Sequence, residues 1–255
     1  MAEKEKKYIF HVTRKDGSFL ILHPFSTPEK FLYALEHSEI EGRYGSEPRV
    51  ETLTMFRNEL YRLVETAVKN WIFDQRFIPK FLISTGVFLV TYFFFSYVVR
   101  DPIPMVDETV LGLGAGILTY VMIGRKDMSS DRAMKKRVEL RSKVDRIKFT
   151  ESNFLKEVES LLYKNESGNF TDTIKQIVAP QYQYPGLGFE KKDEVLSFLR
   201  LLESKFNFKH LKKEEKYFKR FMNGRGEKPI MESKNIDYSL YAVYKMFKKN
   251  ISTLK

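Results

Sequence analysis

Hydrophobic residues are concentrated in the middle of the chain, between two strongly polar regions. Residues 81–99 (FLISTGVFLVTYFFFSYVV) form a run of 19 positions without a charge. At 1.5 Å per residue, this run gives a helix of about 28 Å, close to the thickness of a bilayer's hydrocarbon core. The pattern predicts a transmembrane helix over residues 81–99.

A second apolar run follows after a short link. Residues 109–124 (TVLGLGAGILTYVMIG) carry no charge, and we expect a second span over about residues 105–124 with its acidic residues at the wet end. The link, residues 100–108, contains two prolines that break a helix. We therefore predict a transmembrane hairpin over residues 79–124. The alternative is a soluble protein in which both runs are buried core helices, but the length of the first run argues against it.

The N-terminal segment, residues 1–50, is predicted to be a small β-hairpin followed by a helix. Apolar and polar residues alternate over residues 8–12, a turn with Gly17 at positive φ follows, and residues 19–22 run back. Proline at the first helical position predicts a short helix over residues 28–37.

The regions that flank the hairpin read as helical. Residues 41–48 read as a loop, and residues 51–78 form an amphipathic juxtamembrane helix that we expect to end at Pro79. Beyond the second span, residues 125–255 form a basic, mostly helical region, whose predicted apolar face begins with Met134, Val138, Val144 and Ile147. The two flanking helices are expected to pack together as a stalk.

The charge distribution predicts the orientation in the membrane. The chain has 44 Lys and Arg against 33 Asp and Glu, a net charge of +11, and the excess lies in its C-terminal half, whereas the link has a single basic residue. The positive-inside rule then places both termini in the cytoplasm, and we favour a bacterial inner membrane over an organelle membrane. The basic residues expected to face acidic lipid are Arg125, Lys126, Arg132, Lys135, Lys136 and Arg137.

No residue pattern predicts catalysis, a cofactor or a metal. The absence of cysteine excludes disulfides, iron–sulfur clusters and thiol chemistry. The four histidines have no ligand spacing, and the common nucleotide, zinc-protease and hydrolase motifs are absent. An enzymatic role is therefore not expected, although the absence of a motif does not exclude one.

Small residues in the second span predict helix packing. Gly112 and Gly116 form a GxxxG pattern, which lets two helix backbones approach closely in lipid. We expect the partner to be the first span of the same chain, near residues 84–86, because the short link holds the two together. Another subunit is the alternative.

Two further charged groups have competing interpretations. Asp101, Asp107 and Glu108 either keep the link in water or form an acidic mouth around an oligomer axis. A C-terminal cluster, interleaved with aromatic residues, suits phosphate or lipid headgroups, or is an amphipathic helix with solvated lysines. Its residues are Lys209, Lys212, Lys213, Lys216, Lys219 and Arg220.

Together these features predict a mainly α membrane protein, with a two-helix transmembrane hairpin and a cytoplasmic α+β body. The body has an N-terminal β-hairpin and is otherwise helical. The expected function is a non-enzymatic membrane anchor or scaffold that interacts with proteins or acidic lipids through its basic body. A subunit of an oligomeric channel or transporter is the alternative. A protein partner or homo-oligomer is compatible with both, and nucleic acid is not an expected partner.

Overall fold

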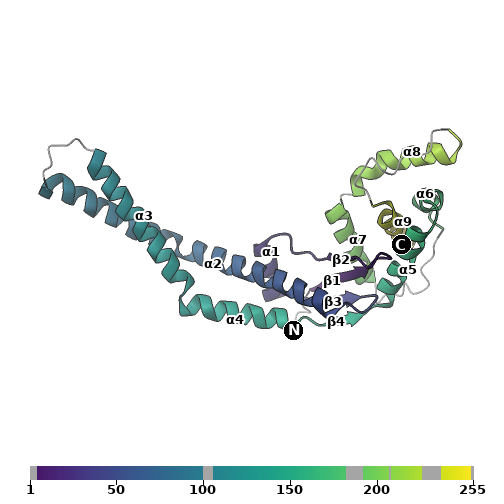
Figure 1. The fold of residues 1–255 in the computed structure, drawn as a ribbon, viewed down its shortest axis with the longest axis horizontal. Helices are drawn as coiled ribbons and strands as arrows, with labels where there is room; N and C mark the ends of the chain where they lie inside the picture. Colours follow the sequence, from purple (N-terminus) through teal and green to yellow (C-terminus); the bar gives the residue numbers. More distant parts are fainter. Residues whose placement is uncertain (1–4, 100–105, 182–191, 207, 226–236, 254–255) are drawn as a thin grey trace. The chain divides into compact units, whose positions relative to one another are not determined.

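The protein is mainly α-helical and contains one four-stranded mixed β-sheet in the computed structural model (Figure 1). The structure describes residues 5–99, 106–181, 192–206, 208–225 and 237–253. The chain divides into two compact units, which are described separately. Unit 1 comprises residues 1–26, 33–56 and 147–255, and unit 2 comprises residues 27–32 and 57–146.

The sheet of unit 1 has the strand order β2-β1-β3-β4. Strands β1 (Lys6–Thr13) and β2 (Phe19–Leu22) pair antiparallel, and Gly17 in the turn has φ +78°, so the predicted hairpin is confirmed. Strand β3 (Glu39–Tyr44) pairs parallel with β1, and β4 (Phe149–Glu151) pairs parallel with β3.

The two parallel strands correct the sequence-based prediction, which assigned residues 41–48 to a loop and expected only helices after the hairpin. Strand β3 is short and polar, with Glu, Arg and Gly among its residues, and β4 has three residues, too few to show a period. Gly42 is required where the two strands meet. A Cβ at Gly42 would lie 2.5 Å from Cδ1 of Phe149, whose ring covers that position.

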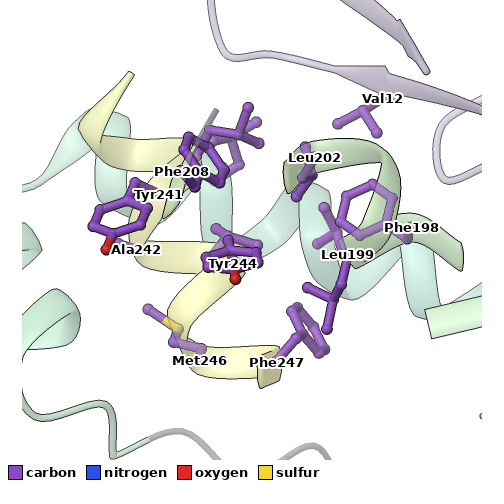
Figure 2. Packing of buried hydrophobic residues seen from close by; sticks show 14 of the residues in the cluster. Val12, Phe198, Leu199, Leu202, Phe208, Tyr241, Ala242, Tyr244, Met246 and Phe247 are labelled. Carbon is purple, nitrogen blue, oxygen red and sulfur yellow. The ribbon is translucent and has the colours of Figure 1, made fainter. Parts of the chain in front are cut away.

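Helices cover one face of the sheet and build the main core. They are α5 (Asn153–Ser167), α6 (Phe170–Val178), α7 (Lys192–Phe206), α8 (Lys212–Met222) and α9 (Tyr238–Thr253), with a 3₁₀ turn at Phe208–Leu211. Phe10 of β1 meets Phe198 of α7 edge-to-face at 5.3 Å, and Phe154 stacks edge-on against Phe198 and Phe247. Figure 2 shows Phe198, Leu202 and Phe247 converging in this core.

The opposite face of the sheet is also covered. Ile9 and His11, which alternate with the core residues of β1, are almost fully buried. Phe56 packs edge-on against Phe149 and lies beside the ring of His23. Burial on both faces corrects the predicted alternation over residues 8–12, because Ile9 and His11 are buried as well as Phe10 and Val12.

Unit 2 contains a helix that is longer than predicted. Helix α2 runs from Val50 to Phe93 and continues as a π-helix over Phe94–Val99, so the predicted boundary at Pro79 is not a helix end. Pro79 has no backbone N–H to donate, but the residues on both sides of it remain helical, so the helix continues through this position. Helices α3 (Val106–Met128) and α4 (Asp131–Asp145) follow, and the first turn of α1 (Pro28–His37) joins this unit.

Helices α2 and α4 pack together, as the stalk prediction expects. Glu65 of α2 accepts hydrogen bonds from Arg137 at 2.8 Å and Arg141 at 2.9 Å. The predicted buried face of α4 is confirmed only in part, because Val144 is buried whereas Met134 and Val138 are exposed. The residues of α4 that are buried are Ala133, Leu140 and Val144.

Most of unit 2 is an insertion in the chain of unit 1. The chain leaves the sheet after β3, forms α2, α3 and α4, and returns as β4, which pairs directly with β3. Along the chain, the inserted helices therefore begin after β3 and end before β4. Within the insertion, α2 and α3 form a helical hairpin.

Candidate functional site

The most unusual feature of the described chain is the exposed apolar surface of α2. The helical stretch from Val50 to Val98 is the one described segment that is long and apolar enough to cross a membrane. Only 6% of its most apolar 18 residues is buried, which distinguishes it from the core helix of a soluble protein. The large exposed side chains on it include Phe73, Phe77, Ile78, Phe81, Leu82, Ile83, Leu89, Val90, Phe93, Phe94, Tyr97 and Val98.

Helix α3 does not reach the same apolar character, so the structure supports one candidate span where the sequence predicted two. The difference has a clear chemical origin: α3 contains four glycines and two threonines, and Asp107 and Glu108 lie in its first turn. Between residues 110 and 122 its large exposed side chains are nevertheless apolar, and they are Val110, Leu111, Leu113, Ile117, Leu118, Val121 and Met122.

Two glycines of α3 lie directly against α2. A Cβ at Gly112 would lie 3.0 Å from the ring of Phe88, and one at Gly116 would lie 3.2 Å from the backbone oxygen of Ser84. A Cβ at Gly114 would meet nothing within 4 Å. Gly112 and Gly116, about one turn apart, therefore lie on the face of α3 that contacts α2, whereas Gly114 does not. The two glycines allow the backbones of α2 and α3 to approach closely.

Polar contacts join α2 and α3 at both ends of this apolar region. At one end, the Ser96 hydroxyl donates a hydrogen bond of 3.1 Å to Glu108. At the other end, the ammonium group of Lys80 lies 3.7 Å from the centre of the Tyr120 ring. The stretches of α2 and α3 between these contacts are antiparallel, because the two residues later in α2 and earlier in α3 meet at one end and the reverse pair meets at the other.

The predicted lipid-facing basic cluster divides into two groups. Arg125, Lys126, Arg132 and Lys135 are exposed. Lys136 instead lies 5.9 Å from the centre of the Trp71 ring, and Arg137 is hydrogen-bonded to Glu65 and to the Met128 carbonyl oxygen. These last two side chains attach α4 to the rest of unit 2.

A groove of about 590 Å³ lies between α2 and α3 at the basic end of the hairpin. Its apolar lining includes Ile72, Phe73, Val121 and Met128, and its charged lining comprises Lys69, Arg76, Lys80, Arg125 and Asp127. Arg76 lies 3.8 Å from Asp127, a long and partly exposed ion pair. The sequence analysis did not identify the groove, although three basic residues of α2 share one helix face at spacings of seven and four.

The acidic link is described in part. Asp101 lies outside the described residues. Asp107 belongs to α3, but its side chain is not among those that the structure describes. Glu108 is half-buried and bonded to Ser96. The structure therefore brings one of the three predicted acidic side chains into a defined contact.

The C-terminal basic cluster lies on the 3₁₀ turn and α8, and two of its aromatic residues belong to the core. Phe208 and Phe218 are buried, so their rings are not available to stack on a ligand. Figure 2 shows Phe208 beside Tyr241 in this core. Of the predicted basic residues, Lys213, Lys216, Lys219 and Arg220 are exposed, and the side chains of Lys209 and Lys212 lie outside the described residues. Lys216 and Lys219 line a second cavity of about 570 Å³ with Tyr241 and Tyr244.

A polar cavity of about 550 Å³ lies at the carboxyl ends of β1, β3 and β4. Its buried carboxylate, Glu159, accepts a hydrogen bond of 2.8 Å from the Thr13 amide and one of 2.6 Å from the Ser46 hydroxyl. A Cβ at Gly45 would lie 2.6 Å from the same carboxyl group. Both oxygens of Glu159 are therefore used to hold strand ends and α5 together, a structural role.

Comparison with known proteins adds no family to this description. The chain matches no known family model, and it has no match among curated proteins or solved structures. Among the described residues, no group of three or more His, Asp or Glu side chains is arranged to hold a metal ion.

Proposed function

We propose that the protein is a two-pass integral membrane protein that acts as a non-enzymatic anchor or scaffold. In this proposal the apolar half of α2 and the part of α3 that ends at Gly124 cross the bilayer, and the connected basic regions interact with acidic lipids or other proteins. The observation that carries the proposal is the exposed apolar surface of α2. Water does not stabilise so large an exposed apolar surface, whereas the hydrocarbon core of a bilayer does.

Three features support a second crossing by α3. Its exposed apolar side chains extend from Val110 to Met122, and its close contacts through Gly112 and Gly116 suit packing within lipid. The Ser96–Glu108 contact and the Lys80–Tyr120 contact bound the apolar region at its two ends. Its uncharged stretch of about 24 Å is shorter than the hydrocarbon core, a mismatch that costs a fraction of a kcal/mol per ångström.

The proposed orientation has both termini in the cytoplasm, in a bacterial inner membrane. It rests on the excess of basic residues after α3, where Arg125, Lys126, Arg132 and Lys135 are exposed to interact with the acidic leaflet. Each of them contributes about 1 kcal/mol near an anionic surface.

Cysteine labelling tests the number of spans and the orientation together, because the chain has no cysteine of its own. Three single substitutions are needed: Asp16→Cys in the β-turn, Asp101→Cys in the link and Arg132→Cys after α3. A membrane-impermeant maleimide applied to intact cells is expected to label only Asp101→Cys. Lysed cells provide the control in which Asp16→Cys and Arg132→Cys are also labelled.

Each alternative gives a different labelling pattern. A single span would place Arg132→Cys and Asp16→Cys on opposite sides, so that one would be labelled in intact cells and the other would not. Labelling of Asp16→Cys and Arg132→Cys but not Asp101→Cys would contradict the proposed orientation. Equal protection of all three in intact cells, with the protein in the soluble fraction, would contradict the membrane anchor itself.

A further inference from the structure

The groove at the basic end of the hairpin combines two kinds of surface. Phe73 and Val121 are 48% and 43% exposed and give it an apolar wall that water does not stabilise. Four basic side chains and one carboxylate line the same groove. Among the described residues, Lys69 and Arg125 have no carboxylate partner, and Asp127 faces Arg76 only at 3.8 Å. The groove thus has an excess of positive charge beside apolar surface.

From this combination we infer that the groove binds a single anionic phospholipid, with its phosphate between Arg76, Lys80 and Arg125 and an acyl chain along Val121. The inference rests on the proposed function, since the groove then lies at the depth of the lipid headgroups. Charge complementarity determines the occupant. The phosphodiester of a phospholipid carries a negative charge that pairs with the basic residues, and an acyl chain of the same lipid covers the apolar wall.

The contacts around Lys80 favour a bound headgroup over a diffuse attraction to the membrane surface. Its ammonium group lies against the Tyr120 ring and next to Gly124, where a Cβ would lie only 2.6 Å from the nitrogen. Gly124 therefore leaves room for the lysine between the two helices. Lys80 therefore has less rotamer freedom before binding than a surface lysine, and it loses less conformational entropy when it contacts a phosphate.

Arg125 and Arg76 complete the positive side of the groove from different helices. Arg76 reaches it from α2, and Arg125 from the last turn of α3, where a basic residue is also favoured by the helix dipole. A bound phosphate would thus contact both helices of the hairpin and stabilise their packing. Thermal stability is consequently a direct measure of binding.

The experiment measures the unfolding temperature of the full chain in neutral detergent while phosphatidylglycerol is added. Phosphatidylglycerol is expected to raise the unfolding temperature in a saturable manner. Phosphatidylcholine at equal concentration, and inorganic phosphate at equal phosphate concentration, are expected to leave it unchanged. An equal rise with inorganic phosphate would identify a site for free anions and overturn the lipid proposal.

Two double variants with the same loss of charge separate the groove from general attraction. Lys80→Gln with Arg125→Gln removes two groove residues, and Arg57→Gln with Arg62→Gln removes two exposed residues of α2 that lie outside the groove and outside the predicted lipid-facing cluster. The groove variant is expected to bind phosphatidylglycerol at least about tenfold more weakly, from about 1 kcal/mol for each basic contact, and the variant of Arg57 and Arg62 to retain wild-type affinity. Equal losses in both variants would overturn the proposal.

A single variant guards against misfolding of the groove variant. Arg125 is exposed, so Arg125→Gln alone is expected to keep the lipid-free unfolding temperature and still weaken binding of phosphatidylglycerol. Unchanged affinity in this variant would overturn the assigned phosphate position. Failure of the membrane anchor would be seen separately, as wild-type protein that stays dissolved without detergent.

Discussion

Gly116 of α3 lies against the backbone of Ser84 in α2, at a distance where a Cβ would be only 3.2 Å from the Ser84 carbonyl oxygen. Because lipid provides no hydrophobic drive for helices to associate, such close backbone contact is a main source of packing energy within a membrane. The relationship is specific to one face of α3, since Gly114 faces open space.

This difference between the glycines predicts opposite results for two leucine variants. Gly112→Leu with Gly116→Leu is expected to lower the unfolding temperature in detergent, because the added side chains cannot fit against Phe88 and Ser84 without separating the helices. Gly114→Leu, the matched control, is expected to leave it nearly unchanged. Equal effects of the two variants would contradict the packing of α3 against α2.

The contact between α2 and α4 predicts the effect of removing a buried side chain. Leu140 is fully buried, so Leu140→Ala is expected to destabilise the protein by about 2 to 5 kcal/mol, measured by denaturant unfolding in detergent. Val138, two residues earlier, is 63% exposed, and Val138→Ala is expected to change the stability by less than about 0.5 kcal/mol. The opposite ranking would mean that α4 presents its other face to α2.

The environment of His11 predicts a pH dependence of stability. His11 is only 3% exposed, neither ring nitrogen has a hydrogen-bond partner within the described chain, and burial lowers its pKa below the ordinary value of about 6.5. As the pH falls through 6.5, the unfolded chain gains a proton that the folded chain does not. The stability contributed by neutral His11 is therefore present above about pH 6.5 and lost below it.

Unfolding at pH 7.5 and pH 5.5 tests this dependence. The slope attributable to His11 has an upper limit of about 1.4 kcal/mol per pH unit. It is expected to disappear in His11→Phe, which keeps a ring of similar size, and to persist in His37→Gln, which changes an exposed histidine. An unchanged slope in His11→Phe would show that other groups control the acid sensitivity.

Local sequence patterns were enough to predict the elements whose partners are close in the chain. The β1–β2 hairpin and helix α1 have their turn, cap and alternation signals within a few residues. Strands β3 and β4 depend instead on pairing across the whole insertion, and Gly42 is explained only by the ring of Phe149. The sequence could not provide that distant contact.

The same distinction applies to the candidate site. Residues 81–99 form one apolar run in the sequence. In the structure they lie in the exposed end of α2 and the π-helix that continues it. The groove combines Lys69, Arg76 and Lys80 with Arg125, which lies more than forty residues further along the chain. On α4, apolar residues occur on two faces, and only the packing against α2 determines that Leu140 is buried and Met134 is exposed.

The membrane anchor is tested most directly by fractionation of cells that express the full chain. After cell breakage, the pellet of a high-speed centrifugation is washed with alkaline carbonate and then extracted with a non-ionic detergent. The account predicts that the protein remains in the carbonate-washed pellet and is released only by the detergent. Recovery of folded protein in the first supernatant, without detergent, would contradict it.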